Sequence, residues 1–517
     1  MKLVKKSSTP SPEVTRQAAV TGLAVNRREF LRNTGLVAGG AALAASLSPG
    51  MMRKARATTE APAGSETKTA RTICTHCSVG CGIYAEVKNG VWTGQEPAFD
   101  HPFNLGAHCA KGASVREHGH GERRLKYPMK LVDGKWKRIS WDEAVNEVGD
   151  RMLQIREQSG PDAVYWLGSA KHNNEQAYLF RKFAALWGTN NVDHQARICH
   201  STTVAGVANT WGYGAMTNSY NDIHNSKAIL IIGGNPAEAH PVSLLHVFRG
   251  KERNNAPLIV IDPRFTRTAA HADHFVRIRP GTDVPVVYGM LWHIFQNGWE
   301  DKEFIRQRVY GIDDVKAEVA KWTPDEVERV TGVPEEQVYR AAKLMADNRP
   351  GTFIWCMGGT QHTIGNNNTR AYCIFQLALG NMGVSGGGTN IFRGHDNVQG
   401  ATDLGVLSHT LPGYYGLSEG AWKHWAGVWG LDYDWLVSRF DQEGRPGEFF
   451  GEEGPDATAV VPMTDKGIPV SRWIDGVLED KTNIAQRDNL RAMVFWGHAP
   501  NSQTRGPEMK KAMEKLD

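Results

Sequence analysis

Cysteines are the residues of this sequence whose spacing points most directly to chemistry. Four of the seven fall within residues 74–109 and follow the pattern C-x2-C-x3-C, a gap of 27 residues, then C: Cys74, Cys77, Cys81 and Cys109. Zinc sites usually pair two knuckles with two ligands each, whereas here three thiols share one loop. A 4Fe-4S cluster needs a thiolate at each iron and fits this arrangement better. The spacing therefore favours a cluster, with zinc and disulfides as alternatives.

A second candidate is the stretch ARICHSTTVAG at 196–206, where His200 directly follows Cys199. A buried structural cysteine needs no histidine beside it, whereas a catalytic or metal-bound thiolate is often accompanied by one. The residues alone leave a core thiol and a metal-bound thiol equally open. Cys356 and Cys373 lie in apolar stretches and are expected to be core residues.

Strands and helices alternate along the chain after Cys109. Apolar runs predict strands at 163–170, 228–236, 258–264 and 352–360, and helices are expected at 141–158 and 174–188. Runs such as AILIIGGNP are continuously apolar, which is typical of parallel strands buried on both faces. The predicted fold class is α/β: a small N-terminal iron–sulfur domain followed by open, mostly parallel sheets with helices on both sides.

Two stretches echo each other. ILIIGGNPAEAHP (229–241) and MVFWGHAPNSQ (493–503) each place an apolar strand before glycine, with proline and asparagine nearby. Strand ends of this kind receive phosphate groups in the crevice beyond a parallel sheet. Neither stretch is a GxGxxG or a Walker loop. The echo indicates two related dinucleotide-binding halves.

Charge is unevenly distributed over the 517 residues. Residues 1–57 carry a net charge of +8, so the remaining chain carries −4 of the total of +4. No basic stripe remains for a nucleic-acid partner, and we expect none.

The first 57 residues read as an export signal. NRREFL (26–31) precedes the short apolar run GLVAGGAALAASL (35–47), and ARA follows at 55–57 as a small-x-small cleavage pattern. The apolar run is too short to span a membrane, and the arginine pair resembles a twin-arginine signal. The alternative is a basic linker before a chance apolar segment. The pattern predicts a signal peptide at 1–57, a flexible mature N-terminus at 58–70, and export to the periplasm in the folded state, which lets a preassembled metal centre cross.

These motifs together resemble the dimethyl sulfoxide reductase superfamily of molybdenum or tungsten bis-pyranopterin oxidoreductases. The resemblance is carried by CTHCSVGC, CAKG, DHQARICHSTTVAG, GGNPAEAHP, VIDPRFTRTA, RPGTD and FRGHDNVQGATDLG. Within the superfamily, the chain is similar to catalytic subunits of periplasmic respiratory formate dehydrogenases. The resemblance implies a 4Fe-4S domain at 71–125, α/β domains for the cofactor and the active site at 126–480, and the truncated start of a second dinucleotide-binding half at 481–517.

The resemblance also implies the reaction and its residues. Formate would be oxidised to CO2 at molybdenum or tungsten held by bis(molybdopterin guanine dinucleotide), with Cys199 as the protein ligand to the metal. Many relatives carry selenocysteine at that position. His200 would act as an acid/base or position the reacting group, since an imidazole is balanced between its neutral and charged forms near pH 7. Arg393 would hold both oxygens of the formate carboxylate, as a guanidinium fork can.

Further positions carry over as cofactor contacts. Lys111 would connect the pterin with the cluster. The dinucleotide contacts would come from Gly234, Asn235, Glu238, Asp262, Arg264 and Asp283 on one half and from Gly497, His498 and Asn501 on the other. Electrons would pass through the cluster to a ferredoxin-like multi-cluster iron–sulfur subunit. A membrane cytochrome b subunit, which would associate the enzyme with the membrane, is a further candidate partner.

One departure from the family concerns length. Family chains continue past this one into a further dinucleotide-binding part and a C-terminal β-rich cap, so a separate C-terminal piece of the catalytic subunit is another candidate partner. Two other functions stay open: a superfamily oxidoreductase such as a periplasmic nitrate or polysulfide reductase, and a truncated module for electron relay or assembly.

Overall fold

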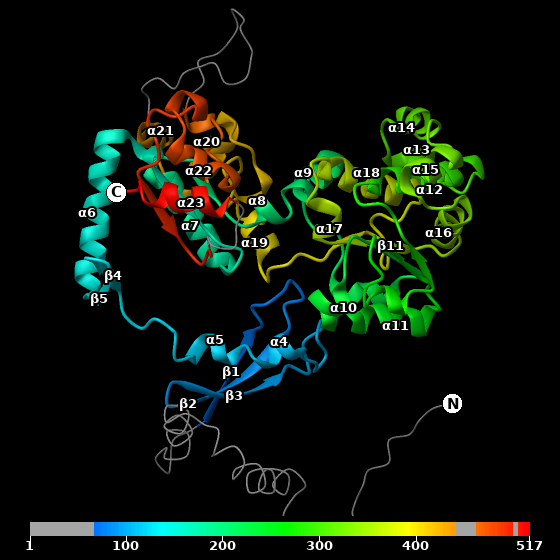
Figure 1. Ribbon diagram of the computed structural model, residues 1–517, viewed down its shortest axis with the longest axis horizontal. Coiled ribbons are helices and arrows are strands. Elements are labelled where there is room, and N and C mark those ends of the chain that lie inside the picture. Colours follow the sequence, from blue (N-terminus) through cyan, green and yellow to red (C-terminus); the bar gives the residue numbers. More distant parts are fainter. Residues whose placement is uncertain (1–66, 441–461, 500–504) are drawn as a thin grey trace, which may run out of the picture. The chain divides into compact units, whose positions relative to one another are not determined.

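The computed structural model describes residues 67–440, 462–499 and 505–517 (Figure 1). The predicted signal peptide, the segment 58–66 and the candidate contact Asn501 lie outside the described residues. The chain divides into two compact units. One contains residues 1–68 and 86–93, and the other contains 69–85 and 94–517.

The N-terminal strands form a three-stranded sheet in the order β1-β2-β3. Their bounds are Thr67–Ile73 for β1, Gly82–Lys88 for β2 and Val91–Pro97 for β3. β1 thus includes residues 67–70, which the sequence led us to expect as flexible. Two short helices follow, α4 at Ala110–Ala113 and α5 at Arg116–His120.

A hairpin and a long helix come next. β4 (Met129–Val132) and β5 (Lys135–Arg138) pair antiparallel. Helix α6 (Trp141–Ser159) begins where the sequence predicted, because the Ser140 side chain accepts a hydrogen bond from the Glu143 amide at 3.0 Å.

A five-stranded sheet in the order β10-β9-β8-β11-β12 forms the larger core, and every neighbouring pair is parallel. Its strands are β8 (Ala228–Ile232), β9 (Leu258–Ile261), β10 (His274–Val276), β11 (Gly351–Trp355) and β12 (Thr389–Ile391). The chain starts in the middle at β8, builds outward through β9 and β10, and then restarts on the other side at β11. The direction of winding therefore switches between β8 and β11, where α/β proteins of this order bind their ligands.

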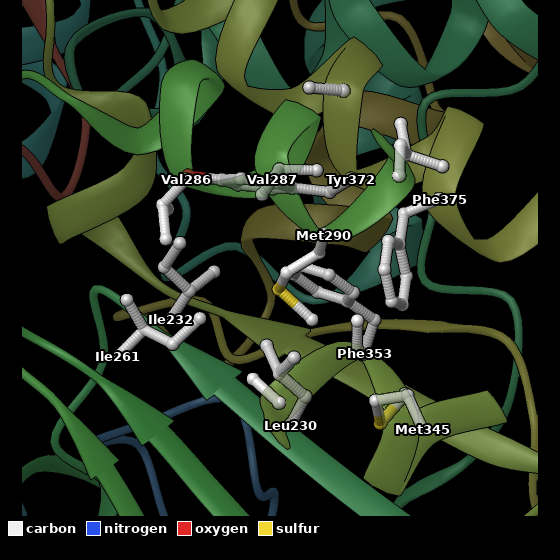
Figure 2. Packing of buried hydrophobic residues seen from close by; sticks show 14 of the residues in the cluster. Leu230, Ile232, Ile261, Val286, Val287, Met290, Met345, Phe353, Tyr372 and Phe375 are labelled. Atoms are coloured by element: carbon white, nitrogen blue, oxygen red, sulfur yellow. The ribbon is translucent and has the colours of Figure 1, made fainter. Parts of the chain in front are cut away.

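Helices cover both faces of this sheet. α11 (Leu244–Asn254) lies over Ile229, because Gly250 leaves room for the closest approach to that side chain. The opposite face carries Leu230 and Ile232, packed against α12 (Asp283–Gln296), α16 (Glu335–Asp347) and α18 (Gly365–Ala378) (Figure 2). Figure 2 shows Met290, Phe353 and Phe375 filling this layer.

A second parallel sheet has the order β13-β6-β7. Its strands are β6 (Val164–Leu167), β7 (Val192–Asp193) and β13 (Ala492–Phe495). Val164 and Trp166 pack with α6 and α7 (Asn174–Trp187), whereas Tyr165 and Leu167 pack with α22 (Trp473–Leu478) and α23 (Gly506–Met513). α7 ends at Gly188 in the left-handed conformation, as expected.

The remaining helices connect these layers. They are α8 (Ala196–Cys199), α9 (Ser201–Trp211), α10 (Pro236–Ala239), α13 (Lys302–Arg308), α14 (Ile312–Val319), α15 (Pro324–Thr331), α17 (Met357–Thr360), α19 (Val398–Asp403), α20 (Glu419–Trp429) and α21 (Tyr433–Arg439). Within the described residues, none of the helices combines the length and apolar character needed to cross a membrane. The α/β class predicted from the sequence is confirmed. The observed strands are shorter than predicted: β6 and β8 end before a glycine, β9 ends before Asp262, and β11 ends before Cys356.

Glycine is required at position 233. Its φ is +57°, and a Cβ there would meet the backbone nitrogen of Gly359 at 2.5 Å. We expect Gly233→Ala to destabilise the protein by about 2–5 kcal/mol, from left-handed strain together with overpacking. Gly281→Ala is the matched control, because its φ is +84° and no atom lies within 4 Å of its Cβ position.

The control should cost only about 1–2 kcal/mol, the left-handed conformation alone. Urea unfolding followed by tryptophan fluorescence measures both variants. Equal losses of stability in the two variants would contradict the close backbone contact between Gly233 and Gly359.

Candidate active site

The predicted site residues gather at the carboxyl ends of parallel strands. Cys199 and His200 follow β7, and Arg393 follows β12. The expected dinucleotide contacts Gly234, Asn235 and Glu238 follow β8, Asp262 and Arg264 follow β9, Asp283 begins the helix after β10, and Gly497 and His498 follow β13. Since parallel strands deliver their following loops to one edge of a sheet, the two sheets bring these segments to their ligand-binding edges.

The glycine turns after β8 and β11 cross at the switch point. The Gly358 amide donates to the Gly233 carbonyl at 3.0 Å, and a Cβ on Gly234 would lie 3.3 Å from that of Cys356. Gly497 is separated from the end of β13 by one residue and has φ +65°, so it is left-handed like Gly233, which directly follows β8. Each stretch of the sequence echo thus has a left-handed glycine soon after its strand.

Cys199 lies in the interior at the end of α8, with 8% of its surface exposed. Burial raises the pKa of its thiol, which the Gly394 amide and the Arg393 charge partly offset. The Thr360 hydroxyl lies 3.3 Å from the Cys199 carbonyl and 3.4 Å from the Cys356 carbonyl. The thiol is therefore held between the loops that follow β11 and β12.

His200 is completely buried between α8 and α9. Burial holds the pKa of its imidazole well below the usual range, and the charge of Arg393 lowers it further. This direction favours the neutral imidazole and differs from the expected balance between neutral and charged forms near pH 7. A neutral ring donates through one nitrogen and accepts through the other.

Hydrogen bonds favour one tautomer of His200. The Trp355 indole, which can only donate, lies 3.1 Å from the Thr203 hydroxyl oxygen. The same hydroxyl lies 3.1 Å from His200 Nδ1. If the Thr203 hydroxyl donates a hydrogen bond to Nδ1, the ring proton sits on Nε2, which has no hydrogen-bond partner among the described residues. His200 then presents an N–H donor.

Arg393 is buried, with 1% of its surface exposed. Its Nη2 donates to the Gly214 carbonyl at 2.5 Å, while Nε and Nη1 have no hydrogen-bond partner among the described residues. His240 Nε2 donates to the Arg393 carbonyl at 2.6 Å and fixes the backbone. A buried cation with unsatisfied donors is costly unless an anion reaches it. The geometry thus fits a small anion beside Cys199.

Cys356 is more than the core residue predicted from its apolar surroundings. It caps α17 at the carboxyl end of β11, and its thiol donates to the Phe392 carbonyl at 2.7 Å. Burial raises the pKa of the thiol to about 12, with a smaller contribution from Cys199. Cys373, by contrast, is fully buried in the core as expected.

The first set of dinucleotide candidates is partly engaged with protein groups. The Asn235 side chain accepts from the Thr268 hydroxyl at 2.8 Å, and Glu238 pairs with Arg267 at 3.6 Å on the surface. Asp262 accepts from the Arg264 amide at 2.8 Å. Gly234 contributes backbone only.

Asp283, another expected dinucleotide contact, is also partly engaged with protein groups. The Tyr372 hydroxyl donates to one of its oxygens at 2.9 Å, and His362 Nε2 lies 3.9 Å from the other. Burial raises the pKa of this carboxyl group. Only one oxygen therefore stays accessible to a new donor without displacing the tyrosine.

The second set lies at the end of the other sheet. The Gly497 carbonyl accepts from the Ser169 hydroxyl at 2.7 Å, and burial lowers the pKa of His498 to about 4. The loop after Arg393 reaches this sheet as well, because the Asn397 amide donates to the Ala170 carbonyl at 3.2 Å. One loop thus connects the Arg393 site with the ends of β6 and β13.

The four N-terminal cysteines are all in the reduced form, and Cys74, Cys77 and Cys81 are buried. Burial, together with the neighbouring thiols of Cys77, Cys74 and Cys109, raises the pKa of Cys81 to about 12. No set of three His, Cys, Asp or Glu side chains in the described ranges is arranged to hold a single metal ion. The loop is fixed by the Cys74 amide, which donates to the Cys81 carbonyl at 2.9 Å.

Four free thiols that interact electrostatically fit an iron–sulfur cluster, because a polycationic centre relieves the repulsion between thiolates. Lys111, two residues after Cys109, donates to the Ala239 carbonyl at 2.8 Å. Lys111 thereby connects the cysteine segment with the turn after β8. A connection between the expected cluster and the expected pterin would have to lie there.

Several contributors had little signal in the sequence. Thr203, Trp355 and His240 all stood in stretches that the sequence analysis had singled out, but Trp355 and His240 act by contacts with distant segments and nothing local marked their roles. Tyr414 and Asp403, bonded to each other at 2.6 Å, also lie close enough to Arg393 to be affected by its charge.

Comparison with curated proteins finds formate dehydrogenase catalytic chains. The chain is 36% identical over 468 residues to the formate dehydrogenase-O major subunit of Escherichia coli, covering 75% of this chain and 46% of that protein. It is 39% identical over 344 residues to the F420-dependent formate dehydrogenase 1 subunit alpha of Methanococcus maripaludis, covering 66% and 50%. The chain thus spans about half the length of these relatives.

Among solved structures, the acetylene hydratase from Pelobacter acetylenicus is similar, with a TM-score of 0.57 and 26% identity over 62% of this chain and 45% of that chain. Residues 67–121 match the molybdopterin oxidoreductase Fe4S4 domain, and residues 124–516 match the molybdopterin oxidoreductase family. With a buried cysteine at a strand end, paired glycine turns and four grouped thiols, the chain belongs to the molybdopterin oxidoreductase family.

Proposed function

We propose that this chain oxidises formate to CO2 at a molybdenum or tungsten bis(molybdopterin guanine dinucleotide) centre. The observation that carries the proposal is Arg393, a buried cation whose charge acts on Cys199 and two of whose nitrogens have no hydrogen-bond partner among the described residues. The names of the similar curated proteins support the same substrate.

Arg393 would bind the substrate. Formate has two oxygens and one C–H bond, and a guanidinium can donate to both oxygens at once. Nε and Nη1 are the donors left free for this, since Nη2 is bonded to Gly214. Holding both oxygens turns the C–H bond away from the arginine. Gly394, the residue after Arg393, lies beside Cys199, so the C–H bond of formate would face the Cys199 thiol.

His200 would orient the reacting group rather than start as a base. With Nδ1 tied to Thr203, its Nε2–H can donate to a group bound next to Cys199. Its neutral state avoids a second positive charge beside Arg393. When bound, the molybdenum or tungsten cofactor would supply a centre that accepts two electrons, and Cys199 would be one of its soft sulfur ligands.

Electrons would leave through the N-terminal cysteines. Lys111 holds the cysteine segment to the turn after β8 and would keep the cofactor within electron-transfer range of the 4Fe-4S cluster. A cluster that receives electrons must pass them on, so we include a multi-cluster iron–sulfur subunit, with a membrane cytochrome b as its further acceptor. Export by a twin-arginine signal to the periplasm belongs to the same proposal and rests on NRREFL at 26–31.

Replacing Arg393 tests the substrate. Arg393→Ala should raise KM for formate by roughly 30- to 1000-fold, since a charged bidentate pair contributes about 2–4 kcal/mol in a buried site. Arg393→Lys should recover only part of the loss, because lysine keeps the charge without the fork. Formate-dependent dye reduction by the complete catalytic unit measures both.

Metal and cluster content are the controls and should be unchanged in both variants. If the complete unit retains its metal and cluster but reduces nitrate or polysulfide and ignores formate, the substrate assignment is wrong and family membership stands. A unit that holds no pterin would instead indicate a relay or assembly module.

Replacing Cys109 tests the cluster. Cys109→Ser should remove most of the paramagnetic resonance signal of the reduced cluster, because one iron loses its thiolate. Cys373→Ser is the matched control: its thiol is buried in the core beside Thr210, so the signal should persist. An unchanged signal in Cys109→Ser, or zinc in stoichiometric amount instead of iron, would refute the cluster.

A further inference from the structure

Arg393 lies near a carboxylate that it does not bind. Burial raises the pKa of the Asp403 carboxyl, and the Tyr414 hydroxyl and the Arg393 charge partly offset that effect, so the three side chains are neighbours. Arg393 nevertheless makes no hydrogen bond to Asp403: Nη2 donates to Gly214, and Nε and Nη1 have no hydrogen-bond partner among the described residues. A buried arginine usually pairs directly with a nearby carboxylate. Some feature of the site must therefore hold Asp403 away from the two remaining donors.

The Tyr414 hydroxyl interacts with both charged groups. It donates its single proton to Asp403 Oδ1 at 2.6 Å. Burial and the Asp403 charge raise the pKa of this hydroxyl, whereas the adjacent Arg393 side chain lowers it. The bond to Tyr414 occupies the Asp403 carboxylate, which would otherwise be the natural partner of the guanidinium.

Tyr414 is held in a backbone conformation that a tyrosine rarely adopts. It ends the short 3-10 segment Pro412–Tyr414 with a φ of +62°. A bulky residue in the left-handed region is strained and persists only where the surrounding structure imposes it, which is common at functional sites. The Tyr213 ring supports it edge-on, with 6.0 Å between the ring centroids. The strain is thus found at a residue that lies beside the arginine expected to bind substrate.

One loop positions all three side chains. The Gly214 carbonyl accepts from Arg393 at 2.5 Å, and Tyr213 contacts the Tyr414 ring. The Met216 amide donates at 3.1 Å to the side chain of Gln399, in the helix α19 that ends with Asp403. A negative charge at the last residue of a helix does not stabilise the helix. The neighbouring cation explains the carboxylate at this position better than helix formation does.

We infer that Asp403 and Tyr414 are positioning residues that keep Arg393 available for an anion. Asp403 offsets the buried positive charge without a direct bond, and Tyr414 holds the carboxylate so that it does not occupy Nε and Nη1. The pair thereby sets how tightly the site binds a small monoanion. The inference rests on the proposed role of Arg393 in formate oxidation, and it assigns neither residue a contact with the substrate.

Anion binding by single variants tests the two roles separately. The complete catalytic unit is reduced with dithionite, so that bound formate is not oxidised, and calorimetry measures the Kd of formate and of azide. Asp403→Asn keeps an acceptor for Tyr414 but removes the negative charge, so both Kd values should fall by about 3- to 10-fold. Tyr414→Phe releases the carboxylate to compete for Arg393, so both Kd values should rise at least about tenfold.

The double variant separates positioning from a general structural role. In Asp403→Asn/Tyr414→Phe no carboxylate is left to compete, so both anions should bind at least as tightly as in the unchanged protein. Two merely structural losses would instead weaken binding together. A double variant that binds more weakly than Tyr414→Phe would overturn the inference. If Tyr414→Phe does not fold, Asp403→Asn alone decides, and an unchanged or higher Kd contradicts the assigned charge.

A second tyrosine–aspartate pair supplies the matched controls. The Tyr84 hydroxyl donates to Asp100 at 2.7 Å in the N-terminal part of the chain. Tyr84→Phe and Asp100→Asn should leave both Kd values unchanged. In turnover assays, KM for formate should follow the order of the Kd values across the active-site variants, while kcat changes by less than KM does.

The two anions distinguish this inference from the proposed substrate. If azide follows the expected order and formate binds to no form, the substrate is wrong and the positioning pair stands. If formate is oxidised and all forms bind both anions equally, the pair has no such role and the substrate stands. Binding of neither anion to any form would refute both.

Discussion

The parallel register of the strands is the constraint on which the site depends. Because β8, β9, β10, β11 and β12 all run in one direction, their following loops reach the same edge, and the winding switch separates the turns after β8 and β11. Gly233 and Gly358 fill that point with backbone only. A side chain there would push apart the turns after β8 and β11, the second of which carries Cys356. The site is therefore built around a close contact of two backbones, and its reactive side chains lie on either side.

Burial then sets the charge state of the site. The thiols of Cys199 and Cys356 have raised pKa values, and the imidazoles of His200 and His240 have lowered ones, in each case chiefly through loss of solvent. These groups are thus neutral in the structure. Arg393 is a guanidinium and keeps its charge. Arg393 also acts on the Asp403 carboxyl, but two of its donors have no hydrogen-bond partner among the described residues and so favour a small anion. The same positive charge lowers the cost of forming a thiolate at Cys199.

Many of these contacts join segments far apart in the sequence. The loop after β12 contacts both sheets: the Arg393 carbonyl accepts from His240 beyond β8, and Asn397 donates to the Ala170 carbonyl beyond β6. A displacement of either sheet would therefore move Arg393.

The sequence alone determined what local pattern can encode. The spacing of Cys74, Cys77, Cys81 and Cys109, the capping of α6 by Ser140, the buried parallel strands and the repeated strand–glycine turn were all predictable, because each depends on neighbours within a few residues or on one characteristic spacing. Tertiary structure alone decided the rest. It turned Cys356 from a core residue into a neighbour of Cys199, engaged one oxygen of Asp283 with Tyr372, and made His200 neutral through burial and Thr203. Charge state and hydrogen-bond partners depend on which distant segments exclude water from a group, and no local pattern in the sequence records that.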